Sequence, residues 1–234
     1  MRICTWNCNM AFRKKYPAIL SCDPDILIVP ECENPDLFDS TFSTNALWVG
    51  KNQHKGLGVF SFHDYEISTH ELYSDDFSYA LPVRVESPEN LNLVALWAMN
   101  NLRNPGRRYI GEVWRAIEYY QNLFDSPAVI AGDFNWNIIW DHRPKMDLDG
   151  DFADVTALLD RHDIQSLYHA SAGIPFGREP DPTLYHRKNR LKPYHVDYIF
   201  SSSDLLCRME SLTVGGYDEW ITLSDHMPVM ATFQ

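Results

Sequence analysis

The sequence lacks any apolar run long enough for a membrane helix, and its first ten residues lack the apolar segment of a secretory signal. It has no low-complexity segment and no repeat at a solenoid period. Its five cysteines form no CxxC pair and no Cys/His spacing suited to zinc. We therefore expect a cytoplasmic protein with no membrane segment and with reduced cysteines in its core. We also expect a monomer.

Basic residues are scarce, since 20 Lys and Arg stand against 32 Asp and Glu and leave a net charge of -12. The sum argues against a polyanionic partner. Most of the basic residues nevertheless gather in five short stretches, at residues 13–15, 51–55, 103–108, 143–145 and 178–192. One basic rim beside a site and ordinary charged loops both explain this clustering, and both stay open.

Short apolar runs bounded by turn residues predict many strands. We expect them at residues 2–8, 26–29, 56–62, 81–86, 91–99, 128–131, 182–185, 195–200, 212–214 and 229–233. Apolar residues recurring at three and four predict helices over 14–21, 109–124 and 152–162. With 45% hydrophobic residues, the 234-residue chain suits one α/β domain, residues 1–234, of two packed sheets with helices outside.

The stretch AVIAGDFNWN, residues 128–137, ends a buried strand in polar side chains. Asp133 and Asn135 are two residues apart and share one face of an extended chain, while Phe134 turns toward the core. For a lone motif of this kind, an Asx turn that closes the strand is the commoner explanation. Three other strand ends carry similar groups, at Asn7, at Glu31 and at Asp225 with His226. Their number favours a shared crevice.

Five short motifs span nearly the whole chain: WNCN at residues 6–9, ILIVPE at 26–31, GDFN at 132–135, VDY at 196–198 and SDHMPV at 224–229. In this order they resemble the motifs of the endonuclease/exonuclease/phosphatase superfamily, which includes apurinic endonucleases, neutral sphingomyelinases, inositol phosphate phosphatases and mRNA deadenylases. The middle of the chain resembles a compact prokaryotic subgroup of it. The resemblance implies a four-layer α/β/β/α sandwich of two mixed sheets with helices outside.

The resemblance also implies a catalytic set of Asn7, Asp133, Asn135, Asp197 and His226. In that set Asp133 orients and deprotonates a water molecule, while Asn7 and Asn135 hold the water and the substrate. His226 binds a nonbridging phosphate oxygen, and Asp197 accepts the other ring proton and favours the charged imidazole. A lone histidine beside a turn aspartate is more often structural, so the pairing with Asp197 is what favours a catalytic role.

Metal binding is implied for Glu31 and Asn9, together with Asp225. Their hard oxygen ligands suit Mg²⁺ or Mn²⁺ and leave room for water and phosphate. Glu33, two residues beyond Glu31, is expected to be solvated or bonded to its turn. We therefore expect Glu31 to be the carboxylate that matters for the metal.

Two positions depart from the family pattern. Pro30 precedes Glu31 where the family usually has Gln, so a side-chain amide is missing. Trp97 stands where the family commonly places a His or Tyr that binds a phosphate oxygen, and Asn100 or a loop arginine is the alternative donor. The candidate substrate-binding residues are Asn100, Arg103, Arg107, Trp136 and Arg187.

Three functions stay open. The favoured one is a metal-dependent nuclease or phosphodiesterase that cleaves DNA or RNA by water attack on phosphorus, with nucleic acid as partner. Base stacking would come from the aromatic residues Phe12, Trp136, Trp140 and Phe176. A phosphatase or phosphodiesterase for a small molecule or lipid head group would better suit an acidic protein. A binding module that has lost catalysis is least favoured, because all the catalytic residue types are present.

Overall fold

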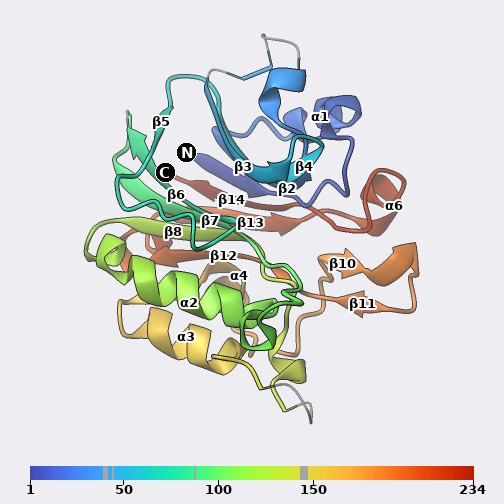
Figure 1. Cartoon of the computed structure of the whole chain (residues 1–234). Helices are drawn as coiled ribbons and strands as arrows, with labels where there is room; N and C mark the ends of the chain where they lie inside the picture. Colours follow the sequence, from blue (N-terminus) through green and yellow to red (C-terminus); the bar gives the residue numbers. More distant parts are fainter. Residues whose placement is uncertain (39–41, 44, 87, 143–146) are drawn as a thin grey trace.

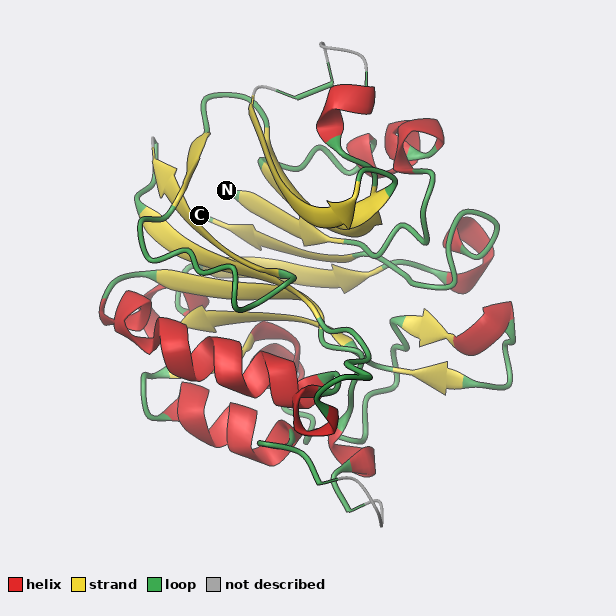
Figure 2. Ribbon diagram, viewed as in Figure 1, coloured by secondary structure: helices red, strands yellow, loops and turns green. Residues whose placement is uncertain are grey.

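The computed structural model describes residues 1–38, 42–43, 45–86, 88–142 and 147–234. The basic stretch at residues 143–145 lies outside these residues. Two six-stranded sheets pack face to face with helices on their outer sides (Figures 1 and 2). Both sheets mix parallel and antiparallel pairs, so the predicted sandwich of two mixed sheets is confirmed. Within the described ranges no helix is long and apolar enough to cross a membrane.

The first sheet contains, in spatial order, β13 (Met209–Val214), β14 (Val229–Phe233), β1 (Arg2–Thr5), β2 (Ile26–Cys32), β4 (Lys55–Ser61) and β3 (Asn45–Asn52). The second contains β5 (Glu66–Thr69), β6 (Ala80–Glu86), β7 (Leu91–Trp97), β8 (Ala128–Asp133), β12 (Asp197–Ser202) and β9 (Ile164–Ser166). A separate two-stranded hairpin joins β10 (Leu184–Tyr185) to β11 (Pro193–Tyr194). In Figure 1 this hairpin projects from the end of the sandwich.

The helices are α1 (Tyr16–Leu20), α2 (Ile110–Tyr120), α3 (Phe152–Asp160), α4 (Leu167–Ala172), α5 (Ser203–Leu206) and α6 (Tyr217–Trp220). Helices α2 and α3 cover the outer face of the second sheet, and α1 and α6 lie on the side of the first (Figure 1). The predicted helix at 14–21 is shorter than expected, and the end of the one at 109–124 is a 3-10 turn, Gln121–Asp125.

Alternation along β8 divides the core into layers. Val129 and Ala131 pack between the two sheets, whereas Ala128 and Ile130 face α2 and α3. Successive side chains on a strand point to opposite faces, so a strand that is apolar throughout fits a sheet covered on both sides. This burial explains why an unbroken apolar run precedes Gly132.

The pairing of strands brings several strand ends to one edge. β1 runs parallel to β2, and β7 runs parallel to β8, so each pair ends on the same side. β12 and β14 run antiparallel to these neighbours, so their first residues lie at that edge. Polar residues at the ends of β1, β2 and β8 therefore meet those at the beginnings of β12 and β14.

Candidate active site

Asn7 links the two sheets at this edge. Its Nδ2 donates to Asp133 Oδ2 at 2.9 Å and to Glu31 Oε1 at 3.4 Å, and its Oδ1 accepts from the backbone N–H of Asn9 at 3.0 Å. Asn7 follows β1 of the first sheet, whereas Asp133 ends β8 of the second. The structure thus brings Glu31 and Asp133 to the same amide nitrogen.

An Asx turn orients Asp133. The backbone N–H of Asn135 donates to Asp133 Oδ1 at 2.8 Å, and its Nδ2 donates to Oδ2 at 3.3 Å. Gly132 makes the tight approach possible, since its φ is 145° and a Cβ there would stand 1.9 Å from the carbonyl oxygen of Leu96. The Asx turn and the shared crevice, which the sequence offered as alternatives, are therefore both present. The turn holds the Asp133 carboxylate toward Asn7.

His226 and Asp197 form a buried pair beside Asp133. His226 Nδ1 donates to Asp197 Oδ2 at 2.8 Å, and Asp197 lies opposite Asp133 in the β12–β8 register. The His226 backbone N–H donates to Ser224 Oγ at 3.0 Å, and that hydroxyl donates to the carbonyl of Asn7 at 2.7 Å. The segment that carries His226 is thus tied to the end of β1. Within the described residues no hydrogen bond engages Nε2.

The charges of this cluster shift its titration. Burial raises the pKa of Asp133 to about 7, and the negative charge of Asp197 adds to the effect. Burial lowers the pKa of His226, but the charges of Asp197 and Asp133 outweigh it and raise that pKa to about 10. Near neutral pH the cluster therefore holds a charged imidazole and a carboxyl group that gains or loses its proton easily. The ligand atoms of the three side chains lie within 4.8 Å of one another.

A β-bulge aims Glu31. The β2–β4 register shifts between Pro30 and Cys32, which leaves Glu31 unpaired with a φ of 64°. Its carboxylate forms an ion pair with Lys55, whose Nζ lies 3.0 Å from Oε2. Pro30 keeps its place in the ladder by accepting from the backbone N–H of Cys8 at 3.2 Å, so the missing N–H is compatible with the strand.

The other two candidate metal ligands bind each other, with Asn9 Nδ2 donating to Asp225 Oδ1 at 2.8 Å. Asn9 lies in a run of three residues with positive φ, residues 9–11, and Lys15 Nζ braces it by donating to the carbonyls of Cys8 and Asn9. Oxygen donors predominate here, and Asp197 Oδ1 is buried without a partner among the described residues. This donor set fits a hard divalent cation.

Glu33 is not solvated, contrary to the first of the two expectations for it. It is buried, pairs with Arg13 at 3.2 Å and accepts from the Arg13 backbone N–H at 3.3 Å. The chain beyond the bulge turns back under the loop of residues 9–15, and this turn encloses the side chain. Glu33 therefore serves the packing of that loop.

The candidate substrate-binding residues separate into two groups. Asn100, Arg103 and Arg107 help to line a cavity of about 320 Å³ beside Trp97. Arg107 is already paired, since it donates to Glu112 at 2.5 and 2.9 Å. Asn100 and Arg103 are exposed. They remain available to a ligand, whereas the charge of Arg107 is largely neutralised.

Arg187 is exposed in the connection between β10 and β11. The base of this hairpin is fastened to the segment that carries His226, because the backbone N–H of Tyr185 donates to the carbonyl of Asp225 at 2.8 Å. The backbone N–H of Met227 likewise donates to the carbonyl of Thr183 at 2.7 Å. Arg187 therefore lies on an arm that is anchored on both sides of His226.

Two of the four proposed stacking aromatics are enclosed by the protein, and two are half-buried. Phe12 and Trp136 are buried, and Trp136 Nε1 donates to Asp141 Oδ1 at 2.7 Å. Trp140 packs against Trp136 and Tyr194, and Phe176 packs against aromatic rings of the core. The turn at Asn135 directs Trp136 inward, whereas Trp140 and Phe176 stay half-buried. Burial therefore weighs against base stacking by Phe12 and Trp136.

Sequence reasoning missed Lys55 and Lys15 as neighbours of the site. Lys55 belongs to a basic stretch at residues 51–55, but only the pairing of β4 with β2 brings it to Glu31. Lys15 follows the WNCN motif closely, and nothing in its spacing indicates that it braces the loop. Both contacts depend on backbone geometry that a local pattern does not encode.

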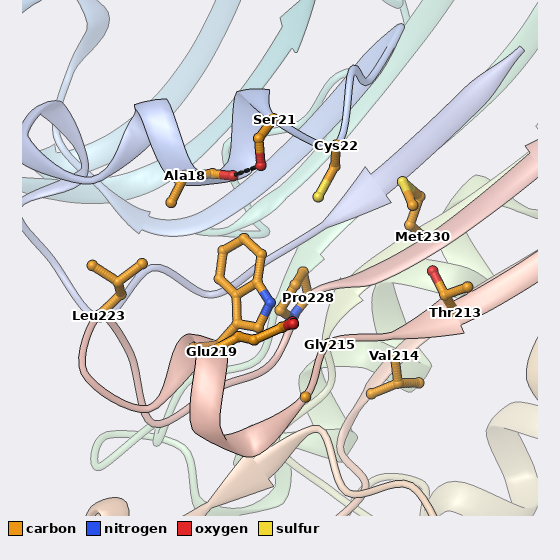
Figure 3. A pocket seen from close by; sticks show the side chains of 12 residues that line it. Ala18, Ser21, Cys22, Thr213, Val214, Gly215, Glu219, Leu223, Pro228 and Met230 are labelled. Carbon is orange, nitrogen blue, oxygen red and sulfur yellow. Dashed lines mark hydrogen bonds between the residues drawn. The ribbon is translucent and has the colours of Figure 1, made fainter.

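A second cavity, of about 480 Å³, lies elsewhere, among α1, α6, β13 and β14 (Figure 3). Cys22, Trp220, Pro228 and Met230 contribute to its wall, and Glu219 is the only charged residue among its described lining residues. Figure 3 shows Cys22, Glu219, Pro228 and Met230 among the side chains that border this cavity. No acid and base converge there, so the cavity does not compete with the strand edge as the catalytic site.

Comparisons with known proteins agree with this fold. A search of curated proteins found no match. The 3′ phosphatase NExo from Neisseria, in a structure bound to product DNA hairpin, has a TM-score of 0.69 at 17% identity, with 100% of this chain and 99% of that chain covered. An AP endonuclease from Archaeoglobus fulgidus gives 0.70 at 17% identity, with 100% and 99% covered.

The endonuclease domain of TRAS1, a telomere-specific non-LTR retrotransposon, gives a TM-score of 0.65 at 15% identity, with 100% of this chain and 97% of that chain covered. At these identities the likeness establishes the fold alone. The model of the Endonuclease/Exonuclease/phosphatase family matches residues 4–226. This match includes the first four motifs in full and the first three residues of SDHMPV. The chain therefore belongs to this family.

Proposed function

We propose that this chain is a divalent-metal-dependent phosphodiesterase that cleaves nucleic acid by attack of water on phosphorus. Family membership supports phosphoester hydrolysis in general. One observation carries the finer proposal: Asn7 joins Asp133 to Glu31, and Asp133 lies beside the His226–Asp197 pair. A base, a fixed cation and a candidate metal ligand thus converge on one strand edge. Residues 1–234 would act as one catalytic domain and as a monomer.

Asp133 acts as the general base. Its pKa of about 7 makes the carboxylate basic enough to accept a proton from water while remaining substantially ionised near neutral pH. Asn7 and Asn135 each donate to this carboxylate and restrict it to one orientation. Water held by Asp133 is thereby directed at the phosphorus of a bound ester.

His226 stabilises charge on the phosphoryl group. Asp197 accepts the Nδ1 proton, so Nε2 carries the proton that is offered to a nonbridging oxygen. Because the pKa of His226 is about 10, the ring is already charged when the substrate arrives. A buried, preorganised cation of this kind stabilises developing negative charge more effectively than water does.

Glu31 and Asn9, with Asp225, would hold Mg²⁺ or Mn²⁺. The ion, when bound, supplies Lewis-acid stabilisation of a phosphoryl oxygen. The chain contributes hard oxygens and a rigid frame: the bulge fixes Glu31, and Asp225 and Lys15 fix the loop that carries Asn9. The two halves of this set are connected through the amide of Asn7.

Nucleic acid is the favoured substrate class because a basic arm adjoins the site. The β10–β11 connection carries the exposed cations Arg187, Lys188, Arg190 and Lys192. Lys188 Nζ donates to the carbonyl of Thr222, and the Arg190 guanidinium lies 4.7 Å from the centre of the Tyr217 ring. These contacts hold positive charge beside the catalytic segment, where successive phosphates of a polymer would pass. NExo, a relative in fold, was solved with a DNA hairpin.

A small phosphoester is the alternative substrate. The net charge of -12 and the 320 Å³ cavity beside Trp97 favour it, because a compact ligand needs few basic contacts. The two substrate classes differ in the expected effect of salt. Binding of a nucleic acid weakens steeply with ionic strength, whereas binding of a single phosphoester in a cavity does so far less.

The test is a screen of purified protein with Mg²⁺ and with Mn²⁺ against single- and double-stranded DNA, abasic DNA, RNA and a panel of phosphomonoesters. Cleavage of a polymer that disappears in EDTA and in Asp133→Asn supports the proposal. Turnover of a phosphomonoester alone would replace it with the phosphatase. Salt-dependent binding without turnover of any substrate would instead leave a binding module of the same fold.

A further inference from the structure

Lys55 contacts the site, although it lies outside all five sequence motifs. It begins β4, and its Nζ lies 3.0 Å from Glu31 Oε2. The same Nζ lies 5.1 Å from the centre of the Trp97 ring, so the ammonium rests on an aromatic face while it pairs with a carboxylate. The side chain keeps 35% of its surface exposed and can change partners without leaving this place.

The ring of Trp97 lies beneath this ammonium group. It ends β7 directly opposite Asp133 in the parallel register, and its ring packs on Tyr79 at a centroid distance of 4.5 Å. Only 2% of Trp97 is exposed, and its Nε1 has no hydrogen-bond partner among the described residues. The indole N–H is therefore enclosed, and Trp97 offers Lys55 the face of its ring.

The charge balance around Glu31 explains the ion pair. Four carboxylates meet at the edge, those of Glu31, Asp133, Asp197 and Asp225, and His226 supplies one buried cation. Lys55 offsets the charge of Glu31 directly. A divalent cation held by Glu31 would take over this role and would repel the nearby ammonium group. Lys55 would then be free to pair with another anion within reach.

We propose that Lys55 and Trp97 form a phosphate-oxygen subsite in which Lys55 exchanges Glu31 for a substrate phosphate when the metal binds. The ligand is an anionic oxygen of a phosphodiester, which accepts from Lys55 Nζ while the ammonium group keeps its place on the face of the Trp97 ring. This inference rests on the proposed function and deepens it. It assigns the phosphate contact to a strand of the first sheet, in place of the histidine or tyrosine that Trp97 replaces.

Two opposite effects follow from removing the charge. Lys55→Met keeps the length of the side chain but removes the competitor for Glu31, so the metal-free protein should bind Mn²⁺ more tightly. The same change removes a phosphate contact, so the metal-loaded protein should bind an oligonucleotide more weakly. A side chain that only packs on Trp97 would leave both affinities unchanged.

The experiment compares Lys55→Met with Lys51→Met in an Asp133→Asn background, in which cleavage is prevented. Lys51 is exposed on the adjacent strand β3, and no ion pair within the described ranges involves it. The first readout is Mn²⁺ affinity without substrate, measured by electron paramagnetic resonance of free Mn²⁺. The second is the affinity for a fluorescent single-stranded DNA in Mg²⁺. Thermal melting in EDTA verifies that each variant folds.

We expect Lys55→Met to tighten Mn²⁺ binding and weaken DNA binding, each about fivefold, the scale of one partly exposed charge contact. Lys55→Arg should restore most of the DNA affinity. Lys51→Met should leave Mn²⁺ affinity unchanged. Unchanged or weaker Mn²⁺ binding by Lys55→Met would overturn the exchange, and unchanged DNA binding would overturn the subsite. If even Asp133→Asn alone binds no DNA, the nucleic-acid proposal fails, while the Mn²⁺ measurement still tests the link to Glu31.

Discussion

Two buried histidine–carboxylate pairs in this chain have similar geometry and different surroundings. His226 donates to Asp197 at 2.8 Å, and His169 contacts Glu179 at 3.0 Å. Both nitrogens of His169 are engaged, since its Nδ1 lies 2.7 Å from Ser166 Oγ. No hydrogen bond among the described residues engages Nε2 of His226. A pair whose hydrogen-bonding capacity is filled holds structure together, whereas a pair with an open nitrogen can bind a ligand.

The two sites also differ in how their surroundings shift the pKa of a carboxylate. Glu179 accepts from His169, from the backbone N–H of Gly177 at 2.8 Å and from Asn137 Nδ2 at 3.2 Å. Burial opposes its ionisation, but these hydrogen bonds outweigh it and lower the pKa of Glu179 to about 2. The pKa of Asp133, by contrast, rises to about 7. The hydrogen bonds to Glu179 satisfy its charged form, whereas the surroundings of Asp133 disfavour its charged form.

The largest expected effect is that of Asp133→Asn. The change keeps the shape of the side chain and removes the group that accepts a proton from water, so kcat should fall by roughly 10³-fold or more. The affinity for DNA should change little, because the neighbouring donors remain. Steady-state kinetics and fluorescence anisotropy measure the two quantities. A variant with wild-type kcat would show that another group activates the water.

The two carboxylates of the compared pairs should respond differently. Asp197→Asn should lower kcat by about 10- to 100-fold, less than the loss in Asp133→Asn, because Asp197 only orients His226 and favours its charged form. Glu179→Gln should leave kcat unchanged and lower the melting temperature, since it weakens a network that ties residues 137 and 177 together. Kinetics and calorimetry on both variants test the contrast. Equal losses of kcat in the two variants would contradict the contrast between the two pairs.

The pH dependence of the rate should reflect Asp133 and His226. The base must be ionised and the imidazole protonated, so the rate should rise as pH passes the pKa of Asp133 and fall near the pKa of about 10 of His226. A bound cation favours the carboxylate, so the acid limb should lie below pH 7 and move upward as Mg²⁺ is lowered. A pH–rate profile at several Mg²⁺ concentrations measures this. An acid limb whose position does not change with Mg²⁺ concentration would contradict the placement of Asp133 beside the bound metal.

The smallest effect concerns stability in acid. The pKa of Glu179 falls from an ordinary 4.5 to about 2 on folding, so its contribution is complete above pH 4.5 and is lost as pH drops toward 2. The contribution is on the order of 3 kcal/mol. Asp133 acts in the opposite sense, because its raised pKa disfavours the fold as pH rises from 3.8 toward 7. Urea unfolding against pH should show a flatter acid limb in Glu179→Gln.

The fold and the convergence of strand ends could be predicted from the sequence because both follow from short-range patterns. Apolar runs mark the strands, and polar residues directly after them must meet once neighbouring strands are parallel. Strands β3 and β5 escaped prediction because they are partly exposed and carry no long apolar run. Their existence depends on the strands beside them.

The errors in the site have a common physical cause. Trp136 follows the GDFN motif and resembles an exposed residue, but the chain turns at Asn135, where φ is 50°, and buries the ring. Lys55 reaches Glu31 only through the pairing of β4 with β2 and the bulge between them. Such contacts arise from register and from backbone turns, which the spacing of residue types does not specify.

The most direct test of the central claim compares His226→Ala with His169→Ala for Mg²⁺-dependent cleavage of a labelled oligonucleotide. We predict that His226→Ala lowers kcat by roughly 10² to 10⁴ and leaves the melting temperature little changed. For His169→Ala we predict wild-type kcat and a lower melting temperature. Wild-type turnover by His226→Ala at saturating Mg²⁺ would contradict the claim that the open histidine–carboxylate pair is the catalytic one.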